Sequence, residues 1–275
     1  MQMIENKNHT SEKEMSFLEH LEELRWHLIR SILAIGIVSF VIFLYPSFIF
    51  DNIILAPKNS SFITNKFLCN LGHVFNSDLL CINTKGLQLI NITMSGQFTM
   101  HIMVSLIAGI IVAFPYIFFE FWSFLKPALY EKERKHTGGA MFFSSLLFII
   151  GVLFGYYVII PLSVNFLSSY SISSQITNQI NINSYVSTVA TIALASGLIF
   201  ELPLLVIVLT RLDIISPSFL RIYRKHALVF ILILSAIITP PDIFSQILVA
   251  FPLLFLYEIS IILSSHINKR NLPAG

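Results

Sequence analysis

Long apolar stretches alternate with polar segments along this chain. Four of them reach the length of a membrane-spanning helix, which needs about 20 mostly apolar residues; they are residues 28–48, 98–119, 140–166 and 186–209. Two further stretches, residues 227–239 and 243–263, flank a turn made of Pro240, Pro241 and Asp242. The pattern predicts an all-α, polytopic membrane protein.

The fifth stretch is the ambiguous one. It has 13 residues, which form about 20 Å of helix at 1.5 Å per residue, and such a length is also typical of re-entrant or interfacial segments. The 17 Lys and Arg divide among the successive polar segments as four, three, four, none, four, none and two. Because cytoplasmic segments are enriched in basic residues, this alternation predicts six spans with both termini in the cytoplasm. Helices five and six are expected to be shortened.

The chain is expected to form a single integral membrane domain over residues 1–275. Residues 1–27 are predicted to be a cytoplasmic amphipathic segment, residues 28–263 the six transmembrane helices, and residues 264–275 a cytoplasmic tail. No internal repeat is recognisable. The longest aqueous segment is the first outer loop, about residues 51–93.

Composition narrows the function classes. Hydrophobic residues make up 55% of the chain and charged residues 12%, against about 25% charged residues in soluble domains. A net charge of +2 offers no basic field for nucleic acid. Two cysteines exclude a four-thiolate metal site, and the eight His show no metal-binding spacing. Hydrolase motifs and a phosphate loop are absent. The sequence therefore predicts no enzyme, no cofactor and no metal.

The first group of candidate functional residues lies at the predicted cytoplasmic surface. Three acids, Glu19, Glu22 and Glu23, lie just before the first span, where basic residues are usual. The second cytoplasmic loop is rich in aromatic residues and adds three further acids, Glu120, Glu131 and Glu133. These features fit a solvated interfacial helix beside an aromatic belt. They equally fit an anionic, apolar surface for a peptide that carries arginine.

Glu201 is the sharpest single feature. It lies in a long run without another charge, two residues before Pro203, and an ionised carboxylate in mid-membrane costs at least about 2.5–3.5 kcal/mol. Glu201 should therefore face a wet cavity or a polar partner, or be protonated and bonded to a neighbouring helix. The sequence leaves these alternatives open.

The two cysteines, Cys69 and Cys81, lie in the one long loop that the charge pattern places outside. Because that compartment is oxidising, we expect a disulfide. Eleven residues separate the pair, and closing such a loop stabilises by about 3 kcal/mol in the chain-entropy model. Two free thiols in a loose loop are the alternative.

Several ordered motifs resemble one known family. The segments are HLEELRWHL at 20–28, FWSFLKPALYEKERK at 121–135, GLIFELPLL at 197–205, TPPDIFSQ at 239–246 and FPLLFLYEIS at 251–260. Together they are similar to the TatC family, the core membrane component of the twin-arginine protein translocase. The likeness covers the chain after about residue 16.

The resemblance implies a function and a set of site residues. It implies a receptor for twin-arginine signal peptides that moves folded cargo proteins across the bacterial inner membrane with the proton-motive force. The implied partners are small single-span TatA- and TatB-type proteins, the lipid bilayer, and further copies of the chain in a receptor complex. Carried over by motif, the signal-peptide-binding residues are Glu23, Arg25, Phe124, Pro127 and Glu133. The membrane-embedded acid is Glu201, and the partner-helix contacts are Thr239, Asp242 and Gln246.

Two other classes of protein compete with this interpretation. A proton-coupled transporter of a small solute would use Glu201 as its proton or substrate site, but it predicts pseudo-symmetric halves that the sequence does not have. A membrane-embedded enzyme predicts a cluster of His, Asp or Cys within the spans, and the sequence has none there.

Overall fold

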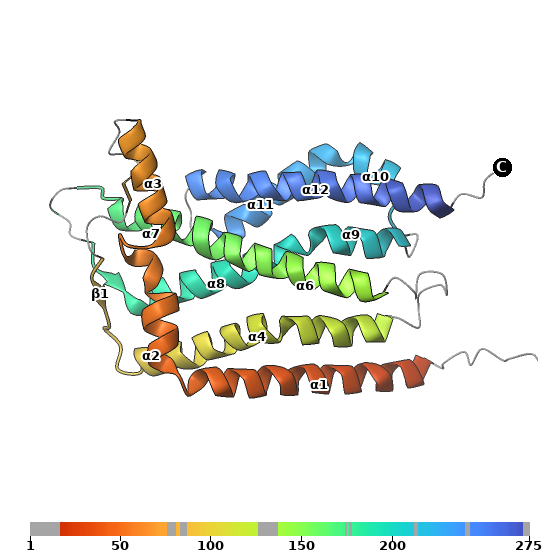
Figure 1. Ribbon diagram of the computed structural model, residues 1–275, viewed down its shortest axis with the longest axis horizontal. Coiled ribbons are helices and arrows are strands. Elements are labelled where there is room, and N and C mark those ends of the chain that lie inside the picture. Colours follow the sequence, from red (N-terminus) through yellow and green to blue (C-terminus); the bar gives the residue numbers. More distant parts are fainter. Residues whose placement is uncertain are drawn as a thin grey trace, which may run out of the picture.

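The protein is a bundle of long helices, seen here in a computed structural model (Figure 1). The structure describes residues 17–75, 81–82, 87–125, 137–173, 175, 178–211, 214–239 and 243–271. The bundle helices are α1 (Phe17–Phe43), α4 (Gly96–Leu125), α6 (Thr137–Phe154), α7 (Ile160–Ser169), α8 (Ile182–Phe200), α9 (Leu202–Arg211), α11 (Arg224–Ile238) and α12 (Ile243–Asn271). Shorter elements are α2 (Pro46–Ile49), η1 (Phe50–Ile54), η2 (Ala56–Lys58), α3 (Ile63–Val74) and α10 (Pro217–Ile222).

The predicted all-α, multi-pass fold is confirmed. Five helical stretches of the described chain are long and apolar enough to cross a membrane. A further helix, α11, has only 15 residues and corresponds to the predicted short fifth span. The beginning of α1 and the end of α12 lie at the same end of the bundle (Figure 1). The membrane-crossing part of helix six, Gln246–His266, is the shortest of the five, with 21 residues. Its helix, α12, has 29 residues in all, because it continues past residue 263 into the polar tail.

Two of the spans are interrupted. The third consists of α6 and α7, joined by a π-helical turn, η5 (Gly155–Ile159). The fourth consists of α8 and α9, and Glu201 lies at the break between them. Pro203 has no backbone N–H to continue the α-helical ladder, and the Glu201 amide bonds the Leu198 carbonyl at 3.2 Å.

Small side chains set the spacing between helices. A Cβ atom at Gly109 of α4 would lie 2.0 Å from the Ser39 Oγ of α1. A Cβ atom at Gly155 would lie equally close, 2.0 Å, to the Ser196 Oγ of α8. Backbones approach closely where a side chain is missing, as is common in membrane helix pairs. Around these contacts, the main apolar core gathers buried residues of α4, α8, α12 and η5.

The end of the bundle opposite to the chain termini is covered by the segment between α1 and α4. Here α3 stands across the direction of the bundle helices (Figure 1). Asn65 holds the preceding turn, because its buried side-chain amide donates to the Asn59 carbonyl at 2.7 Å and to the Pro57 carbonyl at 3.1 Å. Two short parallel strands, β1 (Leu89–Ile90) and β2 (Ile180–Asn181), connect this segment to the start of α8.

Candidate functional site

A cluster of polar and aromatic residues lies between α1 and α4, near the end of the bundle that carries the chain termini. On α1 the members recur every three or four residues and therefore share one face of the helix. The facing members on α4 are spaced by four. We call this group the α1–α4 cluster; it consists of Glu23, His27, Arg30, Tyr116, Glu120 and Phe124.

Glu120 is the centre of the cluster. Its residue is 3% exposed. The Tyr116 hydroxyl donates to Oε1 at 2.7 Å, and His27 Nδ1 lies 2.5 Å from Oε2. Arg30 adds a positive charge, with Nη1 3.9 Å from Oε2. These contacts satisfy a buried carboxylate that would otherwise be costly.

Glu23 lies one helical turn before His27 and is half-buried. Its Oε1 atom is 4.0 Å from His27 Nε2. Its Oε2 atom is buried, and no described residue donates a hydrogen bond to it. The ring of Phe124 packs edge-on against the His27 ring, with centroids 6.3 Å apart. The structure therefore places two of the predicted signal-binding residues, Glu23 and Phe124, beside the same imidazole.

The remaining predicted members of this site are placed differently. Arg25 is exposed, and because two residues correspond to a rotation of about 200° on a helix, it does not share the Glu23 face. Pro127 and Glu133 lie outside the described residues, so their assignment stays a prediction.

Glu201 is half-buried at the α8–α9 break. The Ser144 hydroxyl of α6 donates to its Oε2 at 2.9 Å. Its Oε1 is buried and has no hydrogen-bond partner among the described residues. Ser144 and Pro203 also line a pocket of about 560 Å³ between α6, α9 and α12. The walls of this pocket are mostly apolar, and a polar, water-accessible cavity at Glu201 stays a prediction.

The predicted partner-helix contacts lie where α11 meets α12. Thr239 is buried, and its hydroxyl donates to the Ser235 carbonyl at 2.9 Å. The Gln246 amide of α12 donates to the Leu232 carbonyl of α11 at 3.0 Å. Both side chains thus stabilise the α11–α12 turn. Asp242 lies outside the described residues, and the partner-contact role of all three stays a prediction.

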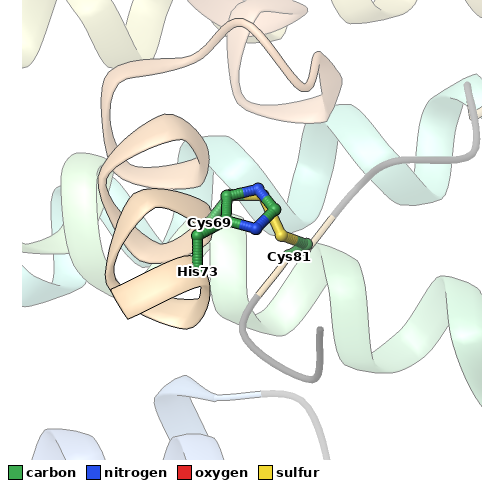
Figure 2. A group of neighbouring side chains, drawn as sticks. All are labelled: Cys69, His73 and Cys81. Carbon is green, nitrogen blue, oxygen red and sulfur yellow. A yellow bond between two sulfur atoms is a disulfide. The ribbon is translucent and has the colours of Figure 1, made fainter. Parts of the chain in front are cut away.

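A disulfide joins Cys69 of α3 to Cys81, with Cα atoms 4.1 Å apart. Figure 2 shows His73, one turn after Cys69, beside the bridge, and its Nε2 is 3.6 Å from the Cys69 sulfur. The three possible ligand atoms lie within 4.8 Å of one another. Thiolates, however, are the metal-binding form of cysteine, and the disulfide uses up both sulfurs.

Sequence reasoning missed the centre of the α1–α4 cluster. It treated Glu120 only as one more acidic residue and gave His27 and Tyr116 no role. A local signal exists on each helix, since Glu23 precedes His27 by four residues and Tyr116 precedes Glu120 by four. This spacing within each helix cannot show that α1 and α4 contact each other.

Comparison with known proteins decides the family. The model of the family described as "Sec-independent protein translocase protein (TatC)" matches residues 19–252. The TatC protein of Blattabacterium sp. subsp. Periplaneta americana (strain BPLAN) is 40% identical over 259 residues, which cover 94% of this chain and 97% of that protein. The chain belongs to the TatC family.

Other TatC proteins agree. TatCy of Bacillus subtilis (strain 168) is 34% identical over 251 residues, covering 91% of this chain and 89% of that protein. A crystal structure titled as the twin arginine translocase receptor TatC in DDM has a TM-score of 0.72 at 34% identity, and the match covers 90% of this chain and 99% of that one. The chain is therefore a multi-pass membrane component of the Sec-independent protein translocase, and nothing in these matches supports the small-solute transporter.

Proposed function

We propose that this TatC-family chain is the receptor and core subunit of a twin-arginine translocase. It binds twin-arginine signal peptides at a cytoplasmic acidic site and, with TatA- and TatB-type single-span proteins, moves folded proteins across the bacterial inner membrane using the proton-motive force. The observation that carries the proposal is the match to the family over residues 19–252, which includes the Glu23 motif.

The chemistry of the α1–α4 cluster supports a site for arginine. A guanidinium group is planar and always charged, and it donates several hydrogen bonds in a fixed fork. Glu23 offers one buried oxygen that no described residue uses, with the aromatic ring of Phe124 close by on α4. Glu133 would take the second arginine, and Arg25 and Pro127 would complete the site.

The proposed orientation has both termini in the cytoplasm. The alternation of basic residues supports it, and so does the position of the two chain ends at one end of the bundle (Figure 1). In this orientation the α1–α4 cluster is cytoplasmic, and α3 with its disulfide is on the outer side of the membrane.

We further propose that the role is non-enzymatic and that several copies associate in a receptor complex within the lipid bilayer. The relatives are named as translocase proteins, and the site offers charge and shape for a peptide. A solute transporter would instead show uptake that depends on Glu201, which a transport assay on this chain can test.

Binding of a twin-arginine signal peptide to the purified chain in nanodiscs tests the proposal. We expect Glu23→Gln and Glu133→Gln each to weaken binding by about tenfold, the lower end for loss of a hydrogen bond to a charged group. Glu258→Gln is the matched control, because Glu258 of α12 pairs with Arg224 of α11 at 2.8 Å, away from the cluster. The proposed site is wrong if both site variants bind the peptide and export its cargo as the unchanged chain does.

A further inference from the structure

Glu120 has no place in the site as the sequence describes it, yet it is the most buried acid of the described chain. A buried ion pair contributes little net stability, because desolvation offsets the attraction. Close packing of α1 on α4 also does not need a charge, since Ser39 and Gly109 achieve it further along the same pair of helices. A buried carboxylate at the Glu23 end therefore calls for another explanation.

The contacts of Glu120 give that explanation. Its carboxylate binds His27 on α1, and the other nitrogen of the same imidazole faces Glu23. Tyr116 fixes the carboxylate on its own helix through a 2.7 Å hydrogen bond. A chain of contacts thus runs from α4, through His27, to the acid that the proposed function assigns to arginine.

We propose that Glu120 is a positioning residue for signal-peptide recognition. By holding His27, it fixes the rotation of the first helical turns of α1, so that the Glu23 carboxylate stays beside His27 on the side that faces α4. The inference rests on the proposed function, because it assigns Glu120 a role at the same site. It adds that the preference for arginine over lysine depends on a residue that does not touch the peptide.

The expected consequence is a loss of specificity as well as affinity. Fork-like binding of arginine requires a carboxylate in a defined orientation, whereas the point charge of lysine requires only proximity. When the Glu23 carboxylate is no longer oriented, the twin-arginine peptide should lose more affinity than a peptide with two lysines. A general loss of folded protein would instead lower both affinities by the same factor.

The test measures both peptides on the full chain in nanodiscs. Glu120→Leu should weaken twin-arginine binding roughly tenfold, as expected for a lost hydrogen bond to a charged group, and should bring the two affinities close together. Glu120→Gln keeps the shape and one acceptor oxygen, so this variant should fold normally. Its affinity for the twin-arginine peptide should lie between those of the unchanged chain and of Glu120→Leu. Glu258→Gln should change neither affinity.

A double-mutant cycle separates action through His27 from other effects. If Glu120 acts through His27, Glu120→Gln has no further effect on binding once His27→Leu is present. Additive effects of the two substitutions, or an unchanged preference for arginine in Glu120→Gln, overturn the inference. Glu23→Gln is measured in parallel. If neither Glu23→Gln nor the Glu120 variants change peptide binding, the proposed site itself is wrong. If Glu23→Gln weakens binding and the Glu120 variants do not, only the positioning role is rejected.

Discussion

At the scale of single residues, Glu201 combines a broken span with an incompletely paired carboxylate. One oxygen bonds Ser144, and the other has no partner among the described residues. We expect Glu201→Gln to keep partial export activity, because it retains hydrogen bonding. Glu201→Leu should lower the export rate by about tenfold or more, since it removes the bond to Ser144 and any bond to a partner helix. Pulse-chase export of a twin-arginine cargo measures the rate.

Signal-peptide binding is the internal control for this substitution. The hydrogen bond of Glu201 goes to Ser144 on α6, whereas the α1–α4 cluster is held by contacts between α1 and α4, so peptide affinity should stay unchanged in both variants. A Glu201→Leu chain that assembles with its partners and exports at the normal rate would reduce Glu201 to a tolerated structural residue.

Single residues also show which parts of the candidate site the sequence could predict. Glu201 was found because one charge in an apolar run is visible in any hydropathy scan. The partnership of His27 with Glu120 was not, because the two residues are 93 positions apart and neither helix carries information about which face its neighbour covers. The motif likeness found Glu23 and Phe124, but it did not predict that both contact His27.

At the scale of elements, the disulfide connects α3 to the segment that follows it. We expect neither Cys69 nor Cys81 to react with a thiol reagent in intact cells until a reductant is added, because the proposed outer compartment is oxidising. Replacing both by Ser should lower the free energy of unfolding of this segment by about 3 kcal/mol in the chain-entropy model. Limited proteolysis of the outer segment measures that loss, with His73→Ala as the control that keeps the bridge. Full labelling before reduction contradicts the bridge.

The apolar runs located the spans but not their ends or interruptions. Residues 98–119 were expected to be helical, and α4 continues to Leu125, because its last turns carry aromatic residues and a buried acid that face α1 and α6. Residues 28–48 were expected as one span, and α1 ends at Phe43 before Pro46 starts α2. The π-helical turn at 155–159 lies directly before Pro161, which has no backbone N–H to offer, and its Gly155 packs closely against Ser196 of α8. The proline is visible in the sequence, whereas the packing against α8 is not.

At the scale of the whole molecule, the six-span topology with both ends inside can be tested directly. In a background with Cys69→Ser and Cys81→Ser, we expect Tyr170→Cys to react with an impermeant thiol reagent in intact cells. Ile222→Cys should react only after permeabilisation, because it lies in a segment with four basic residues. Both positions are exposed, at 62% and 74%, so accessibility within the protein does not limit labelling. The reverse pattern, or labelling of both from one side, would refute the orientation.

The bridge between Cys69 and Cys81 also has a consequence for biosynthesis. The two cysteines are 12 positions apart, within a single loop between the first and second spans, so their pairing requires no later part of the chain. In the proposed orientation the loop leaves the cytoplasm as soon as these two spans insert, while the ribosome is still translating the rest, and chains fold from the N-terminus during synthesis. Formation of the disulfide in a growing chain would then show that the first two spans have inserted and that the loop between them has crossed the membrane.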